Sequence, residues 1–268
     1  MENNFKVLKS MQQNKPFSLF LLLAGFFIAN ALVAEFVGVK IFSLEKTFGL
    51  ETFSFSFFGN ENLGFNLTAG VVLWPVIFIM TDVINEYYGT KSVKLLSYLT
   101  VGLIIYAFIM VYFAIGLKPN DWWQYESGKL AIDSSQHISD MSLSFNRIMG
   151  QGLWIIGGSM IAFLIGQVVD VTIFHEIKRW TGESKVWLRA TGSTLVSQFI
   201  DSYVVLIVAF YIGSDWNLSL VLAIGTVNLI YKFMIAILLT PIIYLAHDVI
   251  DKYLGKELSD KMKAEAAS

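Results

Sequence analysis

The sequence predicts an all-α integral membrane protein with six transmembrane helices. Hydrophobic residues make up 55% of the 268 residues and charged residues only 15%, whereas soluble domains carry about 25% charged residues. The apolar residues fall into blocks of about the 20 residues that a helix needs to cross a bilayer core of about 30 Å. Lys and Arg are abundant in alternate segments between these blocks, as in proteins that cross a membrane repeatedly.

The composition also excludes several classes of function. A net charge of −2 argues against a nucleic-acid partner, which would require a basic face. The absence of cysteine excludes a disulfide framework and thiolate chemistry. The three histidines, His137, His175 and His247, are too scattered for a metal site. We therefore expect neither a metal nor another cofactor.

Six segments are long and apolar enough to cross a membrane. They are residues 17–39, 69–88, 93–117, 152–174, 193–213 and 218–246. The second is the least hydrophobic, because Asp82, Asn85 and Glu86 lie inside it. The sixth is long enough to tilt, and Pro241 favours a bend near its end.

The first segment has a competing interpretation. Lys6, Lys9 and Lys15 precede an apolar run that leads to the small residues Ala29-Asn-Ala31, a pattern shared with cleavable signal peptides. The apolar character continues to Val39, which is longer than the hydrophobic region of a typical signal peptide. We therefore predict a retained span.

The distribution of positive charge predicts the orientation. Thirteen of the 19 Lys and Arg residues lie in the N-terminal tail, the turn after the second span, the loop after the fourth and the C-terminal tail, whereas five lie in the other connections. Because Lys and Arg gather on the cytoplasmic side, both termini are predicted to be cytoplasmic, in a cell inner membrane. The predicted organisation is a tail over residues 1–16, a membrane domain over 17–247 and a second tail over 248–268.

Two predicted external segments are long, at about residues 48–68 and 118–151. In the first, Phe and Ser alternate over residues 52–58, turn-forming residues follow at 59–64, and an apolar segment returns at 65–67, which predicts a short β-hairpin. In the second, Trp122 and Trp123 are typical interface anchors. Residues 141–149 are predicted to form an amphipathic helix on the bilayer surface.

Four of the spans carry polar residues at helical spacing. The pairs are Asp82 and Glu86, Gln167 and Asp170, Gln198 and Asp201, and Asn228 and Lys232. The members of each pair are three or four residues apart and therefore lie on one face of their helix. Because a charge at mid-bilayer is costly, such residues are expected to face a cavity or a helix interface, and they are candidate functional residues.

These polar pairs also have purely structural interpretations. The first pair lies toward the cytoplasmic end of its span and could be interfacial. A lone buried ammonium would lose its proton, so Lys232 is expected to have a carboxylate partner. The structural ion pairs considered are Lys232 with Asp201 or Asp170, and Asp170 with Lys178 or Arg189.

Carboxylates beside carboxamides predict a ligand with paired N–H donors. A carboxylate accepts two parallel hydrogen bonds from such an edge, and an amide both donates and accepts. A guanine-type base has this edge, and Trp74, Phe78 and Tyr203 are candidates to stack on its face. Most of the aromatic residues, which make up 15% of the chain, are expected to pack or to lie at the interface instead.

Motifs of catalysis and of ATP hydrolysis are absent from the sequence. It contains no Walker A loop, no Gly-x-Ser-x-Gly and no His-Glu-x-x-His. Transport is therefore favoured over catalysis, and the sequence does not require an energy-coupling ATPase module. A receptor or scaffold whose polar residues only pack is the second interpretation, and a membrane enzyme is the third.

Four segments together resemble a known family. The first is Thr81-Asp-Val-Ile-Asn-Glu-Tyr-Tyr-Gly89, preceded by Ala69-Gly70 and Trp74-Pro75. The others are Arg147-Ile148, residues 162–174 and residues 187–202. They are similar to the motifs of the queuosine precursor transporter family, also called the vitamin-uptake-transporter-like group, and the resemblance covers about residues 17–247. The Tyr87-Tyr88 pair departs from the family pattern, in which one small or aliphatic residue stands beside a single Tyr.

The resemblance implies uptake of 7-cyano-7-deazaguanine or 7-aminomethyl-7-deazaguanine, the precursors of queuosine in tRNA. It also implies six spans similar to the substrate-binding subunits of energy-coupling-factor transporters. The family's polar positions carry over to Asp82, Glu86, Gln167, Asp170, Arg189, Gln198 and Asp201. The expected partners are thus the lipid bilayer and a deazapurine base, and a homodimer is compatible with the sequence. Another small heterocycle or vitamin is the alternative substrate.

Overall fold

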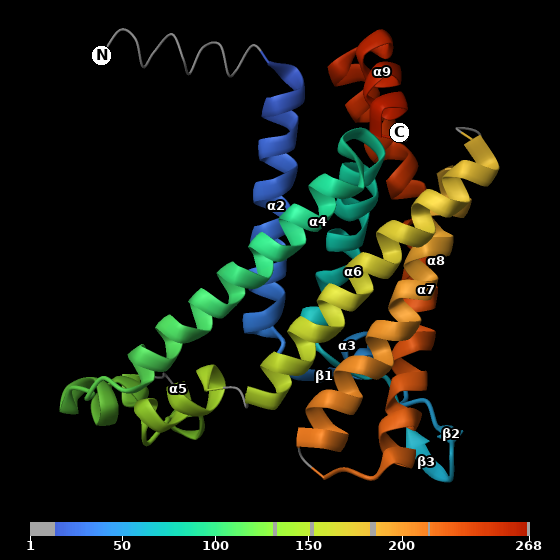
Figure 1. The fold of residues 1–268 in the computed structure, drawn as a ribbon. Helices are drawn as coiled ribbons and strands as arrows, with labels where there is room; N and C mark the ends of the chain where they lie inside the picture. Colours follow the sequence, from blue (N-terminus) through green and yellow to red (C-terminus); the bar gives the residue numbers. More distant parts are fainter. Residues whose placement is uncertain (1–13, 131–132, 151–152, 183–185, 214, 267–268) are drawn as a thin grey trace, which may run out of the picture.

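The computed structural model describes residues 14–130, 133–150, 153–182, 186–213 and 215–266, and it is mostly helical (Figure 1). Within these residues, five helices are long and apolar enough to cross a membrane. They are α2 (Lys15–Val37), α4 (Trp74–Ile115), α6 (Leu153–Thr181), α7 (Val186–Leu206) with its π-helical continuation η6 (Ile207–Ile212), and α8 (Leu218–Leu254). The predicted class, an all-α membrane protein, is confirmed at this level.

The expected second and third spans form one element rather than two separate helices. Helix α4 has 42 residues, and only Gly89 leaves the helical conformation, with φ of +76°. Figure 1 shows the two limbs of α4 folding back on each other at this bend, next to α9 (Lys256–Ala266). The described residues therefore contain five long apolar helices, because a single glycine joins two of the six expected spans without a loop.

The external hairpin is present, but its pairing differs from the prediction. Strand β2 (Phe55–Phe57) pairs with β3 (Asn60–Leu63), and not with the segment at residues 65–67. Phe58 and Gly59 have φ of +52° and +78°, and two consecutive positive φ values are what a two-residue type I′ hairpin turn requires. The turn therefore closes earlier than expected, and β4 (Asn66–Thr68) pairs instead with β1 (Ile41–Ser43).

The second long connection contains short helices. A π-helical turn η2 (Trp122–Glu126) and two 3-10 turns, η3 (Ser127–Leu130) and η4 (Ser134–Gln136), precede α5 (Met141–Met149), which has the bounds predicted for the amphipathic helix. The Asp140 carboxylate accepts a hydrogen bond from the Leu143 N–H at 2.8 Å, a contact that caps α5 and lowers the pKa of Asp140. In Figure 1, α5 and the hairpin lie at the end of the bundle opposite α9.

Helix α9 packs against α4 and α8 at their shared end. Helix α8 continues to Leu254, and Gly255 with φ of +88° separates it from α9. The Asp251 carboxylate at the end of α8 accepts hydrogen bonds from the hydroxyls of Tyr87 at 2.6 Å and Ser259 at 2.5 Å, and from the Lys263 ammonium at 2.9 Å. One carboxylate therefore joins α4, α8 and α9.

A close backbone contact holds the C-terminal end of α2. A Cβ atom added at Gly70, in the 3-10 turn η1 (Ala69–Val72), would overlap the carbonyl oxygen of Ala34 in α2 and would lie 3.4 Å from the Cα atom of Gly38. Because η1 leads directly into α4 at Trp74, this contact sets the position of Trp74 relative to α2. Nearby, Phe65, Val71 and Tyr231 belong to one buried cluster that ties the strands to α8.

We predict that Gly70→Ala destabilises the protein by about 1–3 kcal/mol, because the added methyl group forces the two backbones apart. Gly102→Ala is the matched control, since a Cβ at Gly102, in the second limb of α4, meets no atom within 4 Å. Thermal denaturation of both variants in detergent should show a lower melting temperature for Gly70→Ala alone. Equal melting temperatures would contradict the close contact.

A buried carboxylate organises the segment between β1 and β4. Glu45, in the short helix α3 (Leu44–Thr47), is 1% exposed. Its carboxylate accepts hydrogen bonds from the Phe65 N–H and the Ser43 hydroxyl, each at 2.8 Å. Burial raises the pKa of Glu45, but the hydrogen bonds from Phe65 and Ser43 contribute to holding it below the ordinary value of 4.5.

This depressed pKa predicts the direction of a pH effect. The stabilisation from Glu45 is present above pH 4.5, the unfolded value, and is lost as the pH falls through the lower folded pKa. Hydrogen–deuterium exchange of the peptide around Phe65, corrected for the intrinsic rate, should therefore accelerate as the pH falls through this window. Glu45→Gln should show fast exchange throughout, whereas Glu61→Gln, at an exposed position, should behave as the wild type.

Candidate functional site

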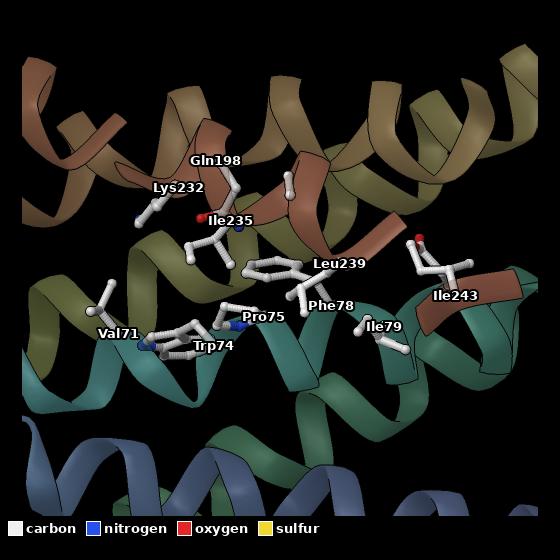
Figure 2. A pocket seen from close by; sticks show the side chains of 12 residues that line it. Val71, Trp74, Pro75, Phe78, Ile79, Gln198, Lys232, Ile235, Leu239 and Ile243 are labelled. Carbon is white, nitrogen blue, oxygen red and sulfur yellow. The ribbon is translucent and has the colours of Figure 1, made fainter. Parts of the chain in front are cut away.

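Two neighbouring cavities lie among the long helices. The larger has a volume of about 390 Å³ and is bordered by α2, the β3–β4 segment, η1, the start of α4, α7, η6 and α8. The smaller, of about 40 Å³, lies between α4, α7 and α8 (Figure 2). Val71, Trp74 and Lys232 border both cavities. The larger cavity is within the range of about 300–1,000 Å³ that small-molecule sites occupy.

The smaller cavity is mainly apolar. Figure 2 shows the side chains of Trp74 and Phe78 on α4 facing those of Ile235 and Leu239 on α8, with Gln198 of α7 at the side. Asp82 also borders this space and is 1% exposed. Because one water needs about 10–15 Å³ of such space, the smaller cavity has room for a few waters and not for a ring system.

The larger cavity combines polar groups from four helices. The Lys232 ammonium of α8 contacts the Asp201 carboxylate of α7 at 2.5 Å, and their side chains are 12% and 22% exposed. The Ser159 hydroxyl of α6 donates a hydrogen bond to the Glu35 carboxylate of α2. Asn228, one turn before Lys232, also borders the cavity. The helices therefore contribute two carboxylates, one ammonium, one amide and one hydroxyl to the cavity that Trp74 also borders, and Asn62 and Asn66 add two further amides.

Further polar residues connect the helices beyond the cavities. The Thr81 hydroxyl of α4 donates to Gln167 Oε1 of α6 at 3.1 Å. Within α6 and α7, the Ser197 hydroxyl donates to Asp170 Oδ1 at 3.2 Å. Closer to α9, the Lys178 ammonium lies 3.3 Å from the Glu86 carboxylate, and both side chains are almost fully buried. Separate polar contacts at Thr81 and Glu86 thus lie along α4 between the cavities and its bend.

The structure brings together part of the predicted site. Trp74 borders both cavities; Asp201, Asn228 and Lys232 face the larger one; and Phe78, Asp82 and Gln198 face the smaller one. Glu86, Gln167 and Asp170 are buried in helix interfaces and border neither cavity.

Two further predicted residues are not placed at either cavity. The Tyr203 hydroxyl shares a hydrogen bond with Thr226 at 3.0 Å, and Tyr203 borders neither space. Arg189 belongs to α7, but its side chain lies outside the described residues.

The ion pairs settle some of the structural alternatives. Of the two partners considered for Lys232, the structure pairs it with Asp201. The Lys178 ammonium lies 3.3 Å from the Glu86 carboxylate, a partner that was not among those expected for Lys178. Asp82 and Glu86 are 1% and 0% exposed, which argues against a merely interfacial position.

Glu35 and Ser159 are two helix residues at the cavity that the sequence patterns did not predict. Glu35 stands near the C-terminal end of the first apolar segment, where a carboxylate is usually an interfacial residue. In the structure it is buried, with 8% exposure. The sequence did contain a signal for Glu35, because it is a charged residue inside a predicted span. It has no polar residue three or four positions away, so it did not form a pair like the other four. Among the described residues, no group of His, Cys, Asp and Glu is arranged to hold a metal ion.

A bundle of apolar helices around a cavity of this size, with a few polar groups in a mainly apolar wall, is typical of membrane proteins that bind small molecules. Residues 68–246 match the family described as "Putative vitamin uptake transporter". The chain belongs to this family of membrane transporters, as the resemblance of its motifs indicates.

Relatives align over most of their length. The chain is 28% identical over 194 residues to the "Probable queuosine precursor transporter" of Bacillus subtilis (strain 168), which covers 71% of this chain and 76% of that protein. It is 26% identical over 208 residues to the "Queuosine precursor transporter" of Escherichia coli (strain K12), covering 76% and 81%. No solved structure matches the chain.

We predict that the Asp201–Lys232 pair holds the wall of the larger cavity. Lys232→Met and Asp201→Asn should each destabilise the protein by about 2–3 kcal/mol, because each leaves an uncompensated or partly unpaired polar group, and the double variant should recover part of this loss. The exposed pair Asp248–Lys252 is the control, and Asp248→Asn should cost about 0–1 kcal/mol. Additive single effects in thermal denaturation would show that Asp201 and Lys232 are not coupled.

Proposed function

We propose that the protein imports a queuosine precursor base, 7-cyano-7-deazaguanine or 7-aminomethyl-7-deazaguanine, across the cell inner membrane. The names of the relatives support this class of substrate, and the family supports transport rather than catalysis. The observation that carries the proposal is the larger cavity, in which carboxylates and an amide lie beside an indole ring. This combination suits a planar base with N–H donors along one edge.

The arrangement of the helices supports six crossings with both ends of the chain in the cytoplasm. At about 1.5 Å per residue, 42 helical residues would extend about 60 Å, twice the thickness of a bilayer core, so α4 has enough length for two crossings. Its bend at Gly89 provides the reversal between them. In Figure 1, the start of α2 and α9 lie at one end of the bundle, which the excess of Lys and Arg assigns to the cytoplasm. Likeness to the substrate-binding subunits of energy-coupling-factor transporters stays a prediction.

We assign successive roles to the polar residues along α4. The base enters from the side of the hairpin and meets Trp74, Asp201, Asn228 and Lys232 in the larger cavity. Phe78, Asp82 and Gln198 lie deeper, where the cavity narrows. Glu86, Gln167 and Asp170 belong to the polar contacts that continue toward the cytoplasmic end, and they would line the onward route after a change of conformation. Proton coupling, diffusion with intracellular trapping and an ATPase module are each compatible with this path.

A vitamin or another small heterocycle is the second candidate substrate, because the description of the matched family names vitamins. The same cavity would accept any planar ring of similar size with donors along one edge. A receptor or scaffold would have no need for a cavity of this volume. The receptor or scaffold interpretation also predicts that replacing Gln167 and Gln198 with Leu would preserve function.

The test uses cells that cannot make the base, supplied with a low external concentration of either precursor, with queuosine in tRNA as the readout. We expect the wild-type protein to restore queuosine. Trp74→Ala should lower uptake roughly 10-fold or more, since stacking of a base on an aromatic ring contributes about 1–3 kcal/mol, whereas Trp74→Phe should retain most of it.

Trp180→Ala is the matched control, because the Trp180 side chain is 81% exposed and lies far from both cavity linings. It should transport as the wild type does. Failure of a well-expressed wild-type protein to restore queuosine would redirect the proposal to another heterocycle. Unchanged uptake by Trp74→Ala would remove the cavity from the proposal.

A further inference from the structure

Glu35 borders the larger cavity from α2, a helix that carries none of the four polar pairs predicted from the sequence. It lies in α2, near the external end, and borders the same space as Trp74, Asp201 and Lys232. Its carboxylate accepts a hydrogen bond from the Ser159 hydroxyl. A carboxylate has about four lone-pair sites on its two oxygens and can therefore accept several hydrogen bonds at once.

The backbone around Glu35 is held in place. The neighbouring residue Ala34 is 2% exposed, and its carbonyl oxygen packs against Gly70 so closely that a Cβ atom there would overlap it. The same turn leads into Trp74, so Glu35 and the indole ring are positioned by one contact. A carboxylate beside an aromatic face at fixed relative position is the geometry that recognises both the edge and the face of a planar base.

The other carboxylates of the membrane domain are less suited to this role. Asp201 binds the Lys232 ammonium at 2.5 Å. Glu86 and Asp170 border neither cavity, and Asp82 faces a space of only about 40 Å³. Glu35 is thus a carboxylate that borders the larger cavity, on the wall formed by α2, and accepts a hydrogen bond from the Ser159 hydroxyl.

We propose that Glu35 determines specificity by accepting the paired N–H donors of a guanine-type ring, the ring N–H and the exocyclic amine. The inference rests on the proposed function and names the residue that selects the base. Both donors of this edge point the same way, so two carboxylate oxygens match them, whereas an amide would place its own NH₂ against one of them. A glutamine at position 35 would instead match a ring edge with one donor and one acceptor, as in adenine-type bases.

The experiment measures binding to the purified full-length protein in lipid nanodiscs, by calorimetry or by ligand-induced thermal stabilisation. The probes are 7-cyano-7-deazaguanine, its analogue without the exocyclic amine, 7-aminomethyl-7-deazaguanine and 7-deazaadenine. The wild-type protein should bind the first roughly 10- to 100-fold more tightly than the analogue, because hydrogen bonds to a charged group contribute about 1.5–3 kcal/mol each.

In Glu35→Gln, affinity for the guanine-type base should fall roughly 10- to 100-fold, affinity for the analogue should change less than about threefold, and 7-deazaadenine should gain relative to both. Glu35→Asp keeps the carboxylate and should retain the discrimination with weaker binding, which also protects the test if the glutamine variant folds poorly. Asp248→Asn, at a side chain that is 55% exposed, is the control and should match the wild type.

Four results would overturn the inference. An equal loss of affinity for every ligand in Glu35→Gln, or no loss for any, would assign Glu35 a structural role or none. A loss confined to 7-aminomethyl-7-deazaguanine, with the neutral cyano compound unaffected, would show that Glu35 binds the ammonium instead of the ring edge. If the wild-type protein binds none of the deazaguanines, the proposed function fails, and the inference about Glu35 fails with it.

Discussion

The need to pair or solvate every charge inside the bilayer is the constraint on which the arrangement of the helices depends. Lys232 and Asp201 join α8 to α7, and Lys178 and Glu86 join α6 to α4. A single charge in any of these helices would be costly in lipid, so the helices must meet where the charges meet. The positions of the charged residues along each helix therefore fix the depth at which neighbouring helices are in register.

Close backbone contact is the complementary requirement. Apolar side chains gain little from leaving lipid for another apolar surface, so helices in a membrane associate through tight packing and hydrogen bonds. Gly70 permits the contact between η1 and α2 that positions Trp74, and a Cβ at Gly158 would lie 3.2 Å from the backbone of α7 and η6. Small residues thus determine the spacing of the cavity walls, while charged residues determine their register.

The long helices are predictable from the sequence because lipid selects for apolar side chains over about 20 residues, and the amphipathic helix at residues 141–149 follows from its own pattern. Other features depend on tertiary structure. The reversal of α4 falls within the turn predicted between residues 88 and 93, but its confinement to one glycine with φ of +76° is not marked by any sequence pattern. Closure of the hairpin depends on a left-handed conformation at Phe58, which its side chain does not favour. Glu35 looks the same in the sequence whether it faces headgroups or a cavity, since the rotation of α2 is set by packing.

The contact between Tyr87 and Asp251 has a consequence for the direction of movement. It joins α4, which carries Trp74, to α8, which carries Lys232, and α9 is bound to the same carboxylate. The two walls of the cavity are therefore fastened together at one end by this polar cluster and by the buried apolar side chains of Ile250, Leu254 and Met262, while at the other end the strands span the gap between them. If the contacts at one end separate, α4 and α8 would rotate apart about the contacts that remain at the other end. Opening one end at a time would give access from one side of the membrane at a time.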